Sequence, residues 1–287
     1  MNFRLDRFLT LYLFNPLLQF VGGKTAILMY HSISNGSQNV HPYYLTLTSP
    51  AVFAEQMRFL HENGCHVIDL MTLVESLNTG EEPPPRSVVL TFDDGLCDFY
   101  THAFPVLQEY KFPATVFLTT GPIDQCACFM GCKCLTWEEA RELRKYGVSF
   151  GSHTESHPVL SQIAEKELLQ EISRSKERIE CETGQSVCAF SYPYAFPEHD
   201  RAHREKLVTM LSMSGYKCCV TTRIGTTSND DDIFCLKRLP VNTLDDRRLL
   251  EAKIKGGYDW ISWLQFLYKN LFKRFRTNAC QNGKGGV

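Results

Sequence analysis

The sequence predicts a single α/β domain built as a (β/α) barrel of seven or eight units. Short β-rich apolar runs alternate with segments of helical period through the middle of the chain, which is typical of βα units around a parallel sheet. Seven or eight such units fit within the 287 residues, and no domain-sized linker or internal repeat divides them. A doubly wound open sheet is the main alternative, since it is built from the same units.

Eight runs have the composition of buried strands. They are residues 26–33, 65–70, 87–94, 114–120, 147–153, 186–193, 217–222 and 235–241. Two outer-layer helices are predicted between them. Residues 49–64 begin at Ser49, which suits an N-cap, followed by a proline, and residues 136–147 begin with a capping box from Thr136 to Glu139.

The composition indicates a folded protein without bulk affinity for polyanions. Hydrophobic residues make up 44% of the chain and charged residues 22%, which is enough for a buried core, and the formal net charge is -2. Nucleic acid is therefore a poor first candidate for a partner. The twelve cysteines are unevenly spaced and do not form the compact framework of a small secreted domain, so we expect reduced thiols and a cytoplasmic protein.

Apolar segments lie near both ends of the chain. Residues 8–20 are too short to span a bilayer and are interrupted by Pro16 and Gln19, so we expect them to be buried or to lie at an interface. Residues 258–276 combine aromatic residues at roughly helical spacing with a basic end; we expect a helix packed on the barrel, and the alternative is contact with a membrane surface. The predicted parts are an N-terminal apolar segment of residues 1–25, a barrel of residues 26–255, and a C-terminal helix and tail of residues 256–287.

Four cysteines gather within nine residues. Cys126, Cys128, Cys132 and Cys134 occupy the run CACFMGCKC, between a predicted strand and the helix at 136–147. Four thiolates would suit a structural zinc, but Cys-x-Cys departs from the usual spacer of two to four residues, so we favour reduced loop thiols. A loop at this place would lie near the mouth of the barrel and help to shape a substrate groove.

Two adjacent carboxylates follow the predicted strand at 87–94. Asp93 and Asp94 come directly after the apolar run and before a glycine turn. Neighbouring carboxylates repel each other unless they share a cation or a proton, so a metal bound by one, with the other as a base, is a chemically reasonable arrangement. The alternative is an Asx-turn or a helix N-cap that uses one Asp for its hydrogen bond.

Two histidines four residues apart follow the strand at 147–153. His153 and His157 lie in the run GSHTESH. Because the carboxyl ends of parallel strands meet at one face of a barrel, these imidazoles can converge with Asp94. One carboxylate and two imidazoles form a facial set that leaves positions for water and substrate, which suits zinc or another divalent ion. Surface or N-cap roles are the alternative for the histidines alone.

In combination, these motifs resemble those of a known family. The run TFDDG, followed by SHTESH and then FSYPYAF, resembles in order and spacing the NodB-homology polysaccharide deacetylases, carbohydrate esterase family 4. The resemblance covers residues 26–241, which is most of the chain. It implies a distorted barrel of the NodB-homology type, in which Asp93 is the catalytic base and Asp94, His153 and His157 hold a divalent metal, zinc by default.

The family's third motif is altered in this chain. Its usual form, Arg-x-Pro-Tyr-Gly, appears as SYPYA at 191–195, and the resemblance implies that the Tyr194 backbone amide is the oxyanion donor. The altered form is similar to the branch that deacetylates poly-N-acetylglucosamine, where the general-acid histidine lies on an N-terminal Tyr-His strand end. His31 is therefore the candidate acid, unless it merely caps a strand. Arg238 is the candidate to orient or tune Asp93, and the alternative is a solvated strand-end charge.

The resemblance implies a metal-dependent hydrolase that removes an N-acetyl group from an N-acetylhexosamine in a polysaccharide or a lipid-linked glycan. The alternatives are deformylation or O-deacetylation of a lipid-linked sugar, and a catalytically weak glycan-binding barrel. Retention of both Asp93 and His31 argues against binding alone, which needs neither a base nor an acid. The expected partner is the acylated glycan, in exopolysaccharide or surface-glycan synthesis. The alternative reading of the terminal segments adds a peripheral contact with the inner face of the cell membrane.

Overall fold

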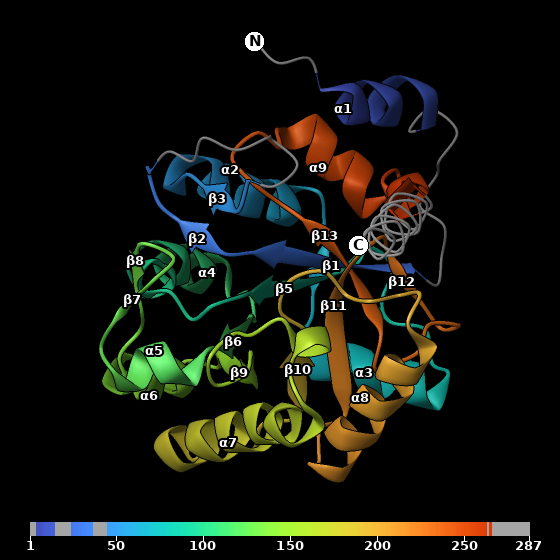
Figure 1. Cartoon of the computed structure of the whole chain (residues 1–287). Helices are drawn as coiled ribbons and strands as arrows, with labels where there is room; N and C mark the ends of the chain where they lie inside the picture. Colours follow the sequence, from blue (N-terminus) through green and yellow to red (C-terminus); the bar gives the residue numbers. More distant parts are fainter. Residues whose placement is uncertain (1–3, 15–23, 37–44, 263, 266–287) are drawn as a thin grey trace, which may run out of the picture.

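Seven parallel strands close into a barrel. The computed structural model describes residues 4–14, 24–36, 45–262, 264 and 265. The first strand, β1 (Lys24–Tyr30), pairs in parallel with β5 (Ser87–Phe92) on one side and with β13 (Leu236–Pro240) on the other, which closes the ring (Figure 1). The other strands of the ring run from β13 to β5 in the order β11 (Cys218–Ile224), β10 (Ala189–Ser191), β9 (Ser149–Ser152) and β6 (Thr115–Leu118).

The barrel confirms the predicted fold class and rules out the open sheet. All eight predicted strands are present, but the run at 65–70 forms only the short strand β4 (His66–Val67), which pairs with the first residues of β5 outside the ring. Short pairs complete the described strands: β12 (Thr227–Ser228) is antiparallel to β1, β2 (Ser32–Ile33) pairs with β3 (Leu47–Thr48), and β7 (Cys128–Phe129) forms a hairpin with β8 (Cys132–Lys133).

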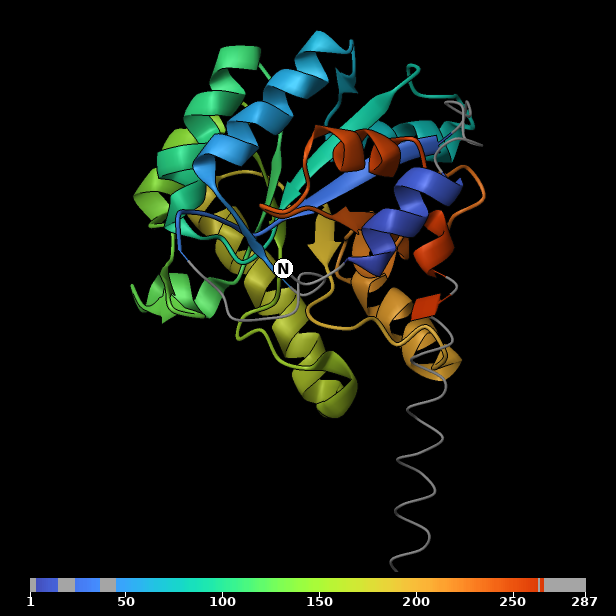
Figure 2. The ribbon, with the colours of Figure 1, turned by 90° about the horizontal axis from the view of Figure 1, so that it is seen from above.

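Helices surround the barrel (Figures 1 and 2). The longer ones are α2 (Pro50–Glu62), α3 (Leu70–Thr79), α6 (Trp137–Lys145), α7 (Glu165–Thr183), α8 (Arg201–Met213) and α9 (Arg247–Ile254). Shorter ones are α1 (Leu5–Leu9), η1 (Thr10–Phe14), η4 (Phe99–Ala103), α4 (Phe104–Tyr110), α5 (Thr120–Asp124) and η5 (Leu160–Gln162). Both predicted helices are confirmed, α2 with Ser49 as N-cap and α6 with the capping box of Thr136 and Glu139.

Apolar side chains fill the amino-terminal half of the barrel interior. The set comes from six strands and comprises Ile27, Val89, Phe117, Ala189, Val220 and Leu236. Leu70, Leu73 and Val74 of α3 pack against it. Polar side chains such as Thr91 and Arg238 occupy the interior closer to the carboxyl ends of the strands. The packing therefore leaves the carboxyl face of the barrel for chemistry, as the fold class predicts.

The terminal segments are described in part. Residues 5–14 form α1 and η1, which lie against α9 (Figure 2), while the rest of the predicted apolar segment, residues 15–20, lies outside the described residues. Residues 259–262 continue as helix, and most of the predicted aromatic and basic helix at 258–276 also lies outside them. Within the described ranges, no helix has the length and apolar character needed to cross a membrane.

Close packing across the barrel makes Gly151 hard to replace. A Cβ at this position of β9 would lie 2.4 Å from two carbons of the buried Phe117 ring and 2.9 Å from the backbone oxygen of Ala189. We expect Gly151→Ala to lower the free energy of unfolding by about 1–3 kcal/mol, because ring and backbone must both shift. Urea unfolding would measure this. Gly36→Ala is the matched control, since its Cβ would meet ordinary contacts at 3.6 Å or more; equal stability of the two variants would contradict the argument.

Candidate active site

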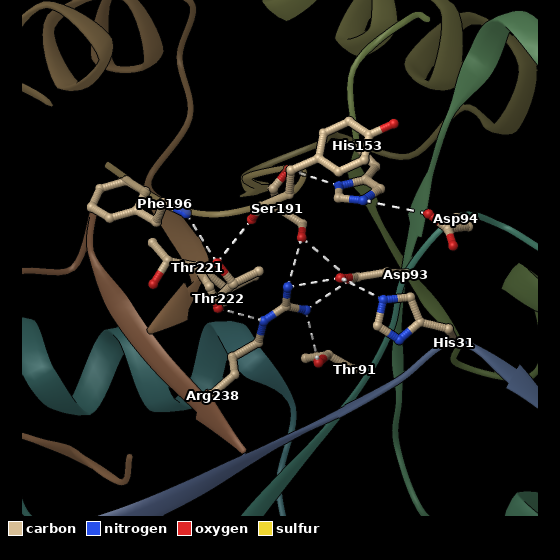
Figure 3. A network of polar contacts seen from close by, with 12 residues as sticks. His31, Thr91, Asp93, Asp94, His153, Ser191, Phe196, Thr221, Thr222 and Arg238 are labelled. Atoms are coloured by element: carbon tan, nitrogen blue, oxygen red, sulfur yellow. Dashed lines mark hydrogen bonds and ion pairs between the residues drawn. The ribbon is translucent and has the colours of Figure 1, made fainter. Parts of the chain in front are cut away.

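Polar side chains from several strands meet at the carboxyl face of the barrel. Asp93 and Asp94 follow β5, and His153 follows β9. Ser191 ends β10, and Arg238 points inward from β13 (Figure 3). His31 follows β1, whose end lies next to that of β5. The closed ring thus brings together residues that lie up to 207 positions apart, His31 and Arg238 being the extremes.

The centre of the site is a buried ion pair between Arg238 and Asp93. The guanidinium donates two parallel hydrogen bonds, from Nη1 to Asp93 Oδ1 and from Nη2 to Asp93 Oδ2, each 2.7 Å long. Both side chains are almost completely buried. Because Arg238 has no exposure to water, the alternative that it is a solvated strand-end charge is wrong. Bidentate geometry of this kind fixes the orientation of the carboxylate as well as its charge.

Neighbouring groups satisfy the remaining donors of Arg238. Its Nε donates to Thr221 O at 3.0 Å, and its Nη2 also approaches Ser191 Oγ at 3.0 Å. The Ser191 hydroxyl in turn donates to Asp93 Oδ1 at 3.2 Å (Figure 3). Ser191 occupies the position at which the resembling family carries its arginine, and the sequence offered no signal that a hydroxyl there would join this network. A buried guanidinium with its donors paired can hold its position without water.

The ion pair keeps Asp93 ionised. Burial alone would raise the pKa of Asp93, but the charge and hydrogen bonds of Arg238 outweigh burial, and the pKa of this carboxyl lies well below its usual range. His31 lies at the other side of the same carboxylate, with Nε2 4.0 Å from Asp93 Oδ2. Burial lowers the pKa of His31 to about 4, so its imidazole is neutral near pH 7.

Asp94, His153 and His157 form a buried group with ligand geometry. The Nε2 atoms of His153 and His157 lie 3.5 and 3.6 Å from Asp94 Oδ1, and 3.1 Å from each other. Their donor atoms all lie within 4.8 Å of one another, and no other group of three His, Cys, Asp or Glu residues in the described ranges meets this criterion. The structure thus brings together the three residues that the sequence pattern pairs with a metal.

The chemistry of this group fits a divalent metal. Burial lowers the pKa of both imidazoles, that of His157 to about 3, so they are in the neutral form that binds metals. His153 Nδ1 donates to Ser191 O at 2.8 Å, which leaves its Nε2 lone pair facing Asp94. Burial, and then the charge of Asp93, raise the pKa of Asp94 to about 8. A cation among these groups would remove the cost of two adjacent buried carboxylates.

Several site residues adopt a left-handed backbone conformation. Asp94, Thr154, His157 and Tyr194 have φ angles of 74°, 72°, 58° and 57°. Such angles are unfavourable for residues with a Cβ and persist only where surrounding contacts enforce them. Around the histidines, Glu171 of α7 supplies these contacts by accepting hydrogen bonds from the backbone N–H groups of residues 155 and 156, each 2.8 Å long. The positioning role of Glu171 has no signature in the sequence.

Two aromatic rings lie against the imidazole of His157. The Tyr194 ring centroid is 4.5 Å from it and the Phe129 centroid 5.1 Å, both edge to face. Phe129 comes from the β7–β8 hairpin, which contains two of the four clustered cysteines, Cys128 and Cys132. Cys126, Cys128, Cys132 and Cys134 are free thiols and do not form a metal-binding group by the distance criterion above. The contribution of this loop to the site is an aromatic side chain, which the cysteine spacing did not indicate.

Comparison with known proteins gives a consistent assignment. A model of the polysaccharide deacetylase family matches residues 80–211. YxkH of Bacillus subtilis, whose name places it among the polysaccharide deacetylases, is 31% identical over 219 residues, which cover 76% of this chain and 72% of that protein. The chain belongs to the polysaccharide deacetylase family. Family membership makes it an amide hydrolase that acts on acetylated polysaccharide.

Other members are similar over parts of their length. The poly-beta-1,6-N-acetyl-D-glucosamine N-deacetylase of Escherichia coli K12 is 37% identical over 112 residues, which are 35% of this chain and 16% of that enzyme. The Staphylococcus aureus enzyme of the same name (strain MRSA252) is 26% identical over 162 residues, which are 53% of this chain and 55% of that enzyme. This chain therefore spans about half of the staphylococcal relative and a small part of the Escherichia coli one.

Two solved structures share the fold of this chain. The Streptococcus pyogenes deacetylase PplD, in complex with acetate, aligns with a TM-score of 0.72 and 26% identity over 82% of this chain and 99% of that one. IcaB from Ammonifex degensii aligns with a TM-score of 0.68 and 23% identity over 82% and 98% of the two chains. The first similarity supports the family assignment, and the second shows the fold.

Removal of Arg238 should destabilise the enzyme strongly. Arg238→Met would leave Asp93 buried and ionised without a cation, so we expect a loss of about 3–5 kcal/mol in the free energy of unfolding. Adding Asp93→Asn removes the uncompensated charge, and the double variant should lose less than Arg238→Met alone. Urea unfolding of the four proteins forms a double-mutant cycle. Arg141→Met, which breaks a partly exposed pair with Glu182, should change little; strictly additive losses in the cycle would refute the coupling.

Proposed function

We propose that this deacetylase removes the N-acetyl group from an N-acetylhexosamine in a polysaccharide or a lipid-linked glycan. The observation that carries the proposal is that two carboxyl groups with different electrostatic surroundings meet at the carboxyl end of the barrel. Asp93 is held ionised by Arg238, while Asp94 faces two neutral imidazoles. The names of the Escherichia coli and Staphylococcus aureus relatives support an N-acetylglucosamine polymer as the substrate class.

Asp94, His153 and His157 would hold the divalent metal, with zinc as the first candidate. Two imidazole nitrogens and one carboxylate oxygen suit zinc and other late first-row ions, and three protein ligands leave positions open. When bound, such a metal polarises an amide carbonyl and lowers the pKa of water. The chain's own residues would then orient the acetamide and move the protons.

Asp93 would take the proton from the attacking water. Its carboxylate is ionised at rest and is held in one orientation by Arg238 and Ser191. Arg238 is a positioning residue in this scheme, because it acts through Asp93 and is itself buried. A carboxylate with a lowered pKa is a weak base, so it relies on an acidified water for the transfer.

His31 would deliver a proton to the leaving nitrogen. Its Nε2 lies 4.0 Å from Asp93 Oδ2, and its side chain is 20% exposed. Because burial keeps the imidazole neutral at rest, it would have to gain a proton within the cycle before it gives one up. The source of this proton would be the attacking water, whose proton would pass to Asp93 and from there to His31.

The Tyr194 backbone N–H would stabilise the developing oxyanion. The turn that carries it is fixed by Thr222, whose hydroxyl donates to Tyr194 O at 2.8 Å and accepts from Phe196 N at 3.0 Å. The positive φ of Tyr194 is enforced by this turn rather than by a glycine. A preorganised backbone donor of this kind typically contributes about 3 kcal/mol to a transition state. The partly exposed Tyr194 and Phe129 rings, which flank His157, would contact the sugar.

The cytoplasmic location stays a prediction. It rests on the number and spacing of the cysteines, and all eleven cysteines in the described ranges are free thiols. A role in exopolysaccharide or surface-glycan synthesis is likewise a proposal, and the names of the relatives support it.

Metal content tests the ligand assignment. We expect about one equivalent of bound divalent metal per chain in the purified protein, with zinc as the first candidate. Chelation should remove this metal, and the metal content should be strongly reduced in His153→Ala, His157→Ala and Asp94→Asn. Elemental analysis by mass spectrometry gives the measurement. His61→Ala, which removes a surface histidine on α2, is the matched control and should retain the metal. Retention of metal by all three ligand variants would refute the assignment.

Acetate release tests the base and the acid. On N-acetylglucosamine oligomers, Asp93→Asn and His31→Ala should each lower kcat by about 10²–10⁴-fold while the metal content stays unchanged. Coupled detection of acetate and separate elemental analysis distinguish loss of chemistry from loss of metal. Full activity of His31→Ala would remove His31 from the mechanism. A metal-loaded wild type that releases no acetate, but releases formate or cleaves O-acetyl groups from lipid-linked sugars, would replace N-deacetylation with one of these reactions.

A further inference from the structure

A third carboxyl group, that of Asp98, lies beside the chain that carries His31. Asp98 follows Asp94 by four residues and comes immediately before η4. Its Oδ2 accepts a hydrogen bond from the Ser32 hydroxyl at 2.5 Å, and its carboxyl group also accepts one from the backbone N–H of Ile33. Ser32 and Ile33 form β2, which begins directly after His31. The side chain of Asp98 therefore ties the start of η4 to β2.

The imidazole of His31 depends on its backbone for its position relative to Asp93. The distance between His31 Nε2 and Asp93 Oδ2 is 4.0 Å (Figure 3), which is too long for a hydrogen bond. A contact of this length does not fix the orientation of the ring. The geometry of the two groups therefore depends on how the chain is held on either side of His31.

The chain before His31 is held firmly, while the chain after it has less support. β1, which ends at Tyr30, pairs with β5 and β13 within the barrel, and Tyr30 O accepts a hydrogen bond from Asp93 N at 3.0 Å. β2 has two residues and pairs with the equally short β3 in a separate two-stranded sheet. A pair of such short strands is only marginally stable by itself. The hydrogen bonds from β2 to Asp98 add an anchor where the sheet provides little.

The anchor of His31 and the carboxylate of Asp93 come from one stretch of chain. Asp93 and Asp98 are five residues apart, and both follow β5. The same stretch thus carries the proposed base near its start and the brace of the proposed acid near its end. Movement of β2 relative to this stretch would change the distance between the two groups.

We propose that Asp98 is a positioning residue for deacetylation, which sets the geometry of His31 relative to Asp93 by holding β2 against η4. The inference rests on the proposed function, in which His31 gives a proton to the leaving nitrogen. Asp98 acts through Ser32 and Ile33, so its loss should change proton transfer and leave metal binding intact. A misplacement of about 1 Å at a reacting group can lower a rate by about 10²-fold.

The test compares Asp98→Ala with His31→Ala in acetate release from N-acetylglucosamine oligomers. Asp98→Ala should lower kcat by about 10–10²-fold, with KM nearly unchanged and metal content equal to that of wild type. In the His31→Ala background, Asp98→Ala should cause little further loss, because no acid is left to position.

Asp98→Asn should keep most of the wild-type kcat. An amide oxygen can accept two hydrogen bonds, so it can replace the acceptor that Ser32 and Ile33 use. The amide NH2 would take the place of Asp98 Oδ1, which is buried and has no hydrogen-bond partner in the described part of the chain. Rescue by Asn thus separates the hydrogen bonds from the charge of the carboxylate.

Asp69→Ala is the matched control. Asp69 also accepts one hydrogen bond from a serine hydroxyl, that of Ser149 at 2.9 Å, and one from a backbone N–H, that of Met71 at 2.8 Å. It lies at the amino-terminal end of the barrel, where β9 begins. Asp69→Ala should lower the unfolding midpoint and leave kcat unchanged at temperatures where the protein is folded.

Ser32→Ala is the second variant if Asp98→Ala does not fold. It removes one of the two donors to Asp98 and should give a smaller loss of kcat, which again disappears in the His31→Ala background. Additive losses in the double variants would overturn the inference, because Asp98 would then act without His31. A loss of metal from Asp98→Ala would also overturn it and assign Asp98 to the support of the metal group.

The same measurements separate this inference from the proposed function. A loss of kcat in His31→Ala, but not in Asp98→Ala or Ser32→Ala, would overturn the positioning role and leave the acid assignment in place. Full activity of His31→Ala would refute the acid assignment, and the positioning role of Asp98 would fail with it.

Discussion

The ion pair between Arg238 and Asp93 is the contact on which the rest of the site depends. It connects β13 to the end of β5 across β1, which pairs with both strands. Because neither partner reaches water, each charge is tolerable only in the presence of the other. The pair therefore requires a closed barrel, and the closed barrel in turn holds Asp93 beside His31 and beside the group of Asp94, His153 and His157.

The pair also shifts the pKa values of the two adjacent carboxylates, Asp93 and Asp94, in opposite directions. Asp93 has its counter-charge within the protein, so it is ionised without help. Asp94 lacks one, and burial beside Asp93 raises its pKa to about 8. The imidazoles of His153 and His157, made neutral by burial, cannot supply the missing positive charge. Near pH 7 Asp94 is therefore either protonated or paired with a cation, and the same electrostatics fit the roles proposed for Asp93 as base and for Asp94 as metal ligand.

Much of this could be predicted from the sequence, because the information is local. Strand runs, the Thr136–Glu139 capping box and the carboxylates directly after a strand are read from neighbouring residues. What could not be predicted depends on distant contacts. Arg238 looked like a possible surface charge because its partner lies 145 residues away, and Phe129 was hidden in a cysteine-rich run whose hairpin folds over His157. Glu171, which enforces the histidine loop from a separate helix, belongs to the same class.

The exposed apolar side chains of residues 5–14 also depend on distant contacts, and the energies of those contacts explain why these side chains stay partly exposed. Phe8 and Tyr12 are 47% and 60% exposed, so rotating the segment to bury them would gain about 1–1.5 kcal/mol for each side chain. The same rotation would withdraw Arg4 from Asp245, a buried carboxylate that also pairs with the buried Lys253, and would break the contact of Thr10 with Trp260. Disturbing a buried network of charges costs several kcal/mol for each charge left unpaired. The second quantity is at least as large as the first, so the polar side holds the inner position, and Leu5, Phe8, Tyr12 and Leu13 stay partly exposed.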